Sequence, residues 1–165
     1  MRKTIMALTS ALTISACNNG NTLTVEQTVN DTLWKQGTHC EFTLKDYPEA
    51  YKYYKQSADM GNAIGYYMLG HALQHGIGVD ENAELSNQAY RKSVALLNEL
   101  LAKGDDKVLL NFIGSAYYWG DGVEQDRKKA TQYYLRSAEL GNPECQYKIA
   151  TCYEQGIGVD QDIEK

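Results

Sequence analysis

Histidines and cysteines are the side chains of this sequence whose spacing is most suggestive of chemistry. His71 and His75 are four residues apart in an expected helix, which is the spacing that lets two imidazoles share a zinc ion. Alanine follows the first histidine where a helical metalloprotease motif has its glutamate base, and no third ligand is evident. His39 and Cys40 form an equally weak pattern. We therefore expect no bound metal and no metalloprotease activity.

The cysteines suggest packing more than reactivity. Cys145 and Cys152 are seven residues apart in a helical pattern, about 10 Å along the axis, which is too far for an unstrained disulfide between them. We expect both to be small buried residues of that helix. Cys40 follows Gly37 in an irregular segment and could pair only with a cysteine that the fold brings to it. In an exported chain, the odd number of cysteines after Cys17 leaves at least one thiol free or intermolecular.

A glycine-rich motif, Gly-x-Gly-Val followed by Asp or Glu, occurs three times, at residues 76–80, 120–124 and 156–160. We call this motif the glycine phrase. Glycine-rich turns before helices can bind phosphate. Each copy here lies between two helical patterns, lacks the Lys and Ser/Thr of a phosphate loop, and has an acidic residue that would repel anions. The phrase therefore predicts a hairpin loop. Because the sequence also shows no set of nucleophile, base and orienting group, we expect neither catalysis nor a cofactor.

The spacing of the phrase predicts an array of helical hairpins. The copies are separated by 44 and then 36 residues, and self-similarity at such intervals is typical of stacked repeats. Apolar residues at intervals of three and four precede each copy and predict a helix, which we call the A helix. We expect the phrase to end the A helix and turn the chain back through glycines in left-handed conformation. These are Gly76, Gly78, Gly120, Gly122, Gly156 and Gly158.

A second helix, the B helix, is expected after each phrase. Its N-cap is an Asp or Asn side chain, at Asp46, Asn82, Asp126 and Asp162. The pattern Ala-x-x-Tyr-Tyr-x-x-Ser-Ala occurs at residues 50–58 and 130–138. No glycine or proline interrupts residues 82–103, so this B helix is expected to be longer by about two turns.

The boundaries of the repeats follow from these patterns. The predicted units are a degenerate first unit at residues 25–61, then 62–104, 105–141 and a partial unit at 142–165. The first A helix is expected around residues 25–36, ending at Gly37. The sequence ends where the last B helix would begin, so we expect the last A helix to expose an apolar face unless another chain covers it, and we attribute this to a truncated record.

The combination of the A-helix small residue, the Gly-x-Gly-Val loop, the capping acid and the Tyr-Tyr-x-x-Ser-Ala motif resembles the Sel-1-like repeat, a relative of the tetratricopeptide repeat. Residues 106–141 match nearly throughout and 46–80 match well, whereas 25–45 and 82–104 depart from the pattern. The resemblance implies an all-α, right-handed superhelix of antiparallel helix pairs that holds protein or peptide partners on its concave face. Of each adjacent tyrosine pair, we expect one ring in the hairpin core with its hydroxyl near the surface.

The first residues predict export. Arg2 and Lys3 precede an apolar stretch too short to span a bilayer, so residues 1–16 resemble a secretory signal peptide. The stretch ends Ile14-Ser15-Ala16-Cys17, which resembles the lipobox of bacterial lipoproteins. This resemblance implies lipidation of Cys17, a tether at residues 17–24 and a membrane anchor, with Asn18 favouring the periplasmic face of the outer membrane. The net charge of −5 argues against nucleic-acid binding.

The expected function is a non-catalytic, lipid-anchored scaffold or adaptor for protein or peptide partners at the bacterial cell envelope. One rival is β-lactam binding or hydrolysis, which the resemblance suggests because some cysteine-rich exported relatives are described that way. Those relatives staple each hairpin with a cysteine pair, and Ala138 and Gln146 stand at the corresponding positions here. A second rival is an envelope regulator of a neighbouring enzyme or secreted effector, which differs from the first hypothesis only in the partner.

Overall fold

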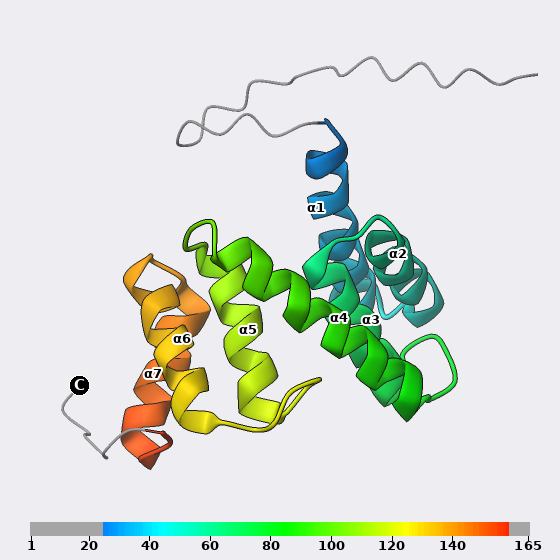
Figure 1. The fold of residues 1–165 in the computed structure, drawn as a ribbon. Helices are drawn as coiled ribbons and strands as arrows, with labels where there is room; N and C mark the ends of the chain where they lie inside the picture. The colour runs from blue at the N-terminus through cyan, green and yellow to red at the C-terminus, as the bar shows by residue number, and fades with distance from the viewer. Residues whose placement is uncertain (1–24, 159–165) are drawn as a thin grey trace, which may run out of the picture.

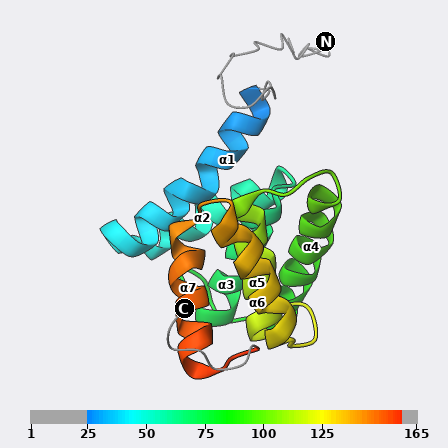
Figure 2. The same ribbon diagram turned by 90° about the vertical axis from the view of Figure 1, so that its left-hand side faces the viewer.

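The computed structural model describes residues 25–158, and all of the regular structure in this range is helical. The elements are α1 (Val25–Thr38), the π-helix η1 (His39–Leu44), α2 (Tyr47–Asp59), α3 (Ala63–His75), α4 (Ala83–Leu101), α5 (Lys107–Trp119), α6 (Arg127–Glu139) and α7 (Pro143–Gln155). Consecutive helices form hairpins, α1 with α2, α3 with α4 and α5 with α6, and the hairpins stack into a solenoid (Figures 1 and 2). No helix in the described range is long and apolar enough to cross a membrane.

Side-chain caps start the B helices. Asp46 accepts the Glu49 amide at 3.2 Å, Asn82 accepts that of Leu85 at 2.9 Å, and Asp126 accepts that of Lys129 at 2.9 Å. Each of these bonds satisfies a backbone donor that has no partner within the helix. Asp162, the fourth expected cap, lies outside the described residues.

In α4 and α6, the serine of the B-helix motif binds the B helix to the start of its A helix. Ser93 in α4 donates to the Ala63 carbonyl at 2.7 Å, and Ser137 in α6 donates to the Lys107 carbonyl at 2.6 Å. Both serines are fully buried. A small residue with one donor fits this position because a larger side chain would separate the two helices.

The two glycines of the loop phrase have different tasks. Gly76, Gly120 and Gly156 end α3, α5 and α7 with φ of 66°, 82° and 64°, in the left-handed region. The second glycine allows the loop to pack on the B helix of the preceding repeat. A Cβ on Gly78 would collide with the backbone of Tyr47 in α2, and one on Gly122 would lie 2.5 Å from the Arg91 nitrogen in α4.

The long B helix displaces the following hairpin. α4 has 19 residues, whereas α2 and α6 have 13 each. Gly78 packs on Tyr47, the residue after the Asp46 cap, but Gly122 packs on Tyr90, eight residues after the Asn82 cap. The α5–α6 hairpin is therefore seated seven residues further along its neighbour, about 10 Å at the usual helical rise. In Figure 1, α4 accordingly runs between the two halves of the solenoid.

The end of the first A helix differs from the prediction. Helix α1 continues past Gly37 to Thr38 and passes into the π-helix η1, which ends at Lys45 with φ 59°. The prediction that Gly37 ends the helix was therefore wrong. Gly37 instead faces the Tyr54 ring, and a Cβ there would collide with that ring. The glycine is needed for the close approach of α1 and α2.

The prediction that the core tyrosines keep their hydroxyls near the surface was wrong for Tyr54, whose hydroxyl is buried, whereas the hydroxyls of Tyr67 and Tyr134 are part-buried. Tyr54 is fully buried and donates to the buried Glu41 carboxylate at 2.6 Å. Tyr67 donates to Asp121 at 2.8 Å, and Tyr134 donates to Ser115 at 3.1 Å. These hydroxyls link one element to another because buried polar groups require partners.

Candidate functional site

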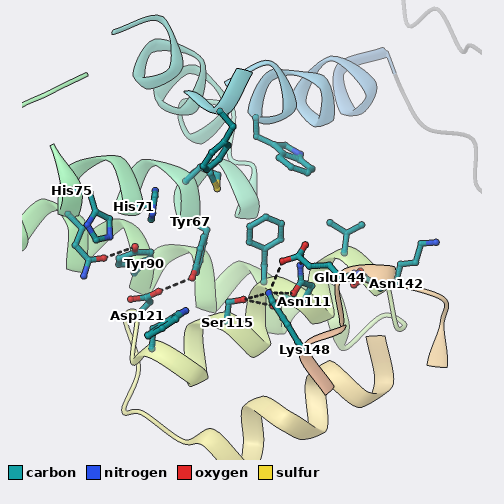
Figure 3. Close-up of a pocket in the computed structure, with 18 of the residues that line it drawn as sticks. Tyr67, His71, His75, Tyr90, Asn111, Ser115, Asp121, Asn142, Glu144 and Lys148 are labelled. Atoms are coloured by element: carbon teal, nitrogen blue, oxygen red, sulfur yellow. Dashed lines mark hydrogen bonds and ion pairs between the residues drawn. The ribbon is translucent and has the colours of Figure 1, made fainter. Parts of the chain in front are cut away.

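A groove of about 830 Å³ lies along the A-helix face of the solenoid (Figure 3). Its lining comes mainly from α3 and α5, with Trp34 of α1, Phe42 of η1, Tyr90 of α4 and the first residues of α7. Its volume lies in the range of about 300 to 1,000 Å³ that is usual for ligand sites. Residues from several hairpins meet here, so the stacking of the repeats creates the groove.

The middle of the groove is apolar and aromatic. The Phe112 ring packs edge-on against Trp34, with centroids 5.8 Å apart, and against Tyr67 at 5.3 Å. Two further aromatic side chains that line the groove are largely exposed, Phe42 at 60% and Trp119 at 67%. Exposed rings on a concave surface are typical of a site that is covered by a partner.

One polar cluster of the groove is internally paired. Lys148 donates to Asn111 at 2.8 Å and forms an ion pair with Glu144 at 2.8 Å. The Asn111 amide nitrogen donates to the second Glu144 oxygen at 3.1 Å. Lys148 also lies 4.9 Å from the centre of the Tyr134 ring, where a cation is attracted to the ring face. The positive and negative charges of this cluster therefore balance.

A second polar cluster, at the other side of the view in Figure 3, consists of Tyr67, His71, His75, Tyr90 and Asp121. Burial raises the pKa of the Asp121 carboxyl, and the hydrogen bond from Tyr67 partly opposes this shift. Burial also raises the pKa of Tyr67, and the nearby Asp121 charge raises it further. Burial lowers the pKa of His71, which favours its neutral form. The cluster thus contains one half-buried carboxylate, Asp121, that accepts a hydrogen bond from Tyr67.

The residues that first suggested chemistry are partly explained by packing. The rings of His71 and His75 are neighbours, with centroids 4.6 Å apart. In residues 25–158, the structure brings no three His, Cys, Asp or Glu side chains into an arrangement that could hold a metal. Cys145 and Cys152 are buried and unpaired, as expected, and Cys40 is likewise a buried free thiol. At the position of the hairpin cysteine pair, the Gln146 side chain donates to the Ala138 carbonyl at 3.4 Å.

Apart from His71 and His75, which were considered only as metal ligands, sequence reasoning missed the groove residues, and above all Asp121. One signal for Asp121 is present in the repeat itself. The glycine phrase has Ile77 and Ile157 in its second place in the outer copies and Asp121 in the middle copy. Ile77 packs against the hydrophobic core. The chain therefore has a carboxylate where its own pattern calls for an apolar residue.

The chain is similar to several known proteins. It is 34% identical over 137 residues to Protein sel-1 homolog 2 of Rattus norvegicus, covering 81% of this chain and 19% of that protein. It is 22% identical over 149 residues to DAP3-binding cell death enhancer 1 of Rattus norvegicus, covering 72% of this chain and 29% of that protein. It thus spans less than a third of the length of these relatives.

The fold is shared with a solved Sel1 repeat protein from Oxalobacter formigenes. The two superpose with a TM-score of 0.53 at 29% identity, covering 81% of this chain and 53% of that one. The model of the Sel1 repeat matches residues 36–62, 63–96, 110–142 and 143–165. Sel1 repeats generally mediate protein–protein interactions. With these matches over most of its length, the chain belongs to the Sel1 repeat family.

Proposed function

We propose that this chain is a non-catalytic adaptor that binds a peptide segment of a partner protein in the groove of its A-helix face. The observation that carries the proposal is the groove itself, with Phe42 and Trp119 exposed on its lining. Large aromatic side chains contribute most of the binding energy in many protein interfaces because they bury much apolar area at a small cost in entropy. The general role of Sel1 repeats supports the same conclusion.

The test is selection of a random peptide library, displayed on phage, against the full 165-residue chain. We expect the wild-type chain to enrich a family of related peptides. The double variant Phe42→Ala and Trp119→Ala should lose that enrichment, because both side chains line the groove. The matched control is Leu85→Ala with Leu140→Ala, which removes two exposed apolar side chains, 48% and 47% exposed, that lie outside the groove. Enrichment that survives the groove variant but not the control would contradict the proposal.

We further propose that the adaptor is exported and lipid-anchored through Cys17 at the periplasmic face of the outer membrane. The support is the sequence Ile14-Ser15-Ala16-Cys17 after a short apolar stretch; these residues lie outside the described part of the chain. Metabolic labelling with an alkyne fatty acid in a bacterial host should label the wild-type chain and leave Cys17→Ser unlabelled. Equal labelling of both would overturn the anchor.

The two rival functions make different predictions. β-Lactam hydrolysis requires turnover of a chromogenic cephalosporin by the purified chain, and we expect none. A regulator of an enzyme or secreted effector would use the same groove, so it differs from the adaptor only in the partner. For that rival, the selected peptides should match a segment of an enzyme or effector, and they should compete with that protein for the groove.

A further inference from the structure

We infer that the groove selects partner segments in which a lysine or arginine stands two positions from a large apolar residue in an extended stretch. This inference rests on the proposed peptide-binding function and specifies its ligand. The apolar side chain would lie against Phe112 and Trp34, and the basic side chain would pair with Asp121.

Asp121 has an unfilled place for a cation. One of its carboxylate oxygens accepts the Tyr67 hydroxyl at 2.8 Å. Among the described residues no lysine or arginine forms an ion pair with it, and His75 is the neighbouring base whose charge lowers its pKa. A half-buried carboxylate without a cation is unfavourable. A ligand cation would relieve that cost.

The other charged side chains of the groove differ from Asp121 in pairing or in place. Lys148 and Glu144 neutralise each other, and Asn111 binds both. Lys107, which also lines the groove, begins α5, whereas Asp121 follows the end of that helix. Asp121 replaces the isoleucine found in the other two loops, so hairpin formation does not require an acid there. The chain as a whole is acidic, with a net charge of −5, which favours approach of basic segments. At the Asp121 end of the groove, charge complementarity therefore favours a basic side chain over an acidic one.

The apolar and acidic parts of the groove lie close together. Tyr67 bridges them, with its ring 5.3 Å from Phe112 and its hydroxyl bonded to Asp121. The two parts are thus separated by about the length of one tyrosine side chain. In an extended peptide, side chains two positions apart point the same way and are about 7 Å apart. The spacing matches a basic and an apolar residue at positions i and i+2, in either order.

The experiment repeats the phage selection with Asp121→Asn and with Glu124→Gln as the matched control. The asparagine keeps an oxygen to accept the Tyr67 hydroxyl, so the variant removes the charge and preserves the hydrogen bond. Glu124 belongs to the same loop, is exposed and lies outside the groove, so its variant removes one charge without touching the site. Circular dichroism on heating checks that both variants fold like the wild type.

We expect Lys or Arg near a large apolar residue to be enriched at least tenfold over Asp or Glu at the same position, for the wild type and Glu124→Gln. A charge-assisted hydrogen bond is worth about that factor or more. Asp121→Asn should lose the preference for a basic residue while it still selects the apolar one. Peptides without a basic residue, or an unchanged preference with Asp121→Asn, would overturn this inference and leave the proposed function standing.

Two outcomes would overturn the proposed function as well. One is the absence of any enriched peptide with a wild-type chain that is folded. The other is a wild-type dimer in sedimentation that Phe42→Ala with Trp119→Ala dissociates, because a second copy would then occupy the groove.

Discussion

At the residue scale, Asp121 shows a position where binding and stability favour different side chains. Burial of its carboxylate raises its pKa above the ordinary value of 3.8. The stabilising contribution of this group is therefore complete below pH 3.8 and is lost as the pH rises through its folded pKa. At neutral pH the charged form has lost that contribution.

The first prediction is that Asp121→Asn unfolds at a higher temperature than the wild type at pH 7, and that this difference shrinks as the pH falls toward 3.5. The physical reason is that the neutral amide avoids the cost of burying a charge. Thermal unfolding followed by circular dichroism at several pH values measures it. A variant that is less stable at pH 7, or a difference independent of pH, would show that the buried charge stabilises the fold.

The second prediction compares two loop glycines with similar φ, Gly122 at 72° and Gly141 at 79°. Gly141→Ala should cost about 1 to 2 kcal/mol, because only the left-handed backbone opposes an alanine there and nothing lies within 4 Å of its Cβ. Gly122→Ala should cost about 2 to 5 kcal/mol, because its Cβ would also strike the α4 backbone. Urea unfolding gives both values, and equal costs would contradict the packing role of the second glycine.

Sequence patterns predicted residue positions well where the cause is local. The N-cap side chains of Asp46, Asn82 and Asp126 accept amides three residues further on, and the glycines that end the A helices donate to carbonyls four residues back. The roles of Gly122 and Asp121 depend on elements far apart in the chain, namely Tyr90 in α4 and Tyr67 in α3. Only the break in the repeat, where Asp121 stands in place of isoleucine, hinted at this in the sequence.

At the element scale, the additional length of α4 could be predicted but its consequence could not. An uninterrupted apolar pattern indicated a longer helix, and α4 has 19 residues. The displacement of the next hairpin follows from where the Gly122 loop packs, which depends on tertiary contacts. Similarly, no local sequence pattern predicted the π-helix at residues 39–44, which follows the close approach of Gly37 to the Tyr54 ring.

The third prediction concerns this displacement. Deleting residues 95–102 would restore the spacing of 36 residues between glycine phrases and leave Lys103-Gly104-Asp105 to connect the shortened helix to the Asp106 cap. We expect the shortened chain to unfold cooperatively, because the second and third glycine phrases already have this spacing. It should bind selected peptides at least tenfold more weakly, because the groove residues of α5 would shift along the solenoid relative to those of α3. Peptide titration and thermal unfolding measure both. Unchanged affinity would show that the displacement is irrelevant to binding.

At the scale of the whole molecule, the core is unevenly distributed along the solenoid. The larger cluster of buried apolar residues extends from η1 to α5, and the smaller one contains Ala130, Tyr134, Cys145 and Ile149. In a repeat array, stability depends on each unit and its neighbours. Local opening should therefore begin where the buried cluster is small.

The fourth prediction is that backbone amides of α7 exchange with deuterium at least tenfold faster than those of α3. Both helices have 13 residues and both end at a left-handed glycine, so they are matched in length and termination. The expected difference comes from the size of the cluster that each one packs against. Hydrogen exchange followed by mass spectrometry measures it, and equal protection would indicate a single cooperative unit.

The measurement that tests the central claim most directly is site-specific photocrosslinking of a selected peptide. A photoreactive phenylalanine analogue is placed at Phe42 or Trp119 on the groove, or at Leu85 or Leu140 outside it. The groove account predicts that the labelled peptide crosslinks from positions 42 and 119 and that an excess of unlabelled peptide suppresses both. Crosslinks of equal or greater yield from positions 85 and 140 would contradict it.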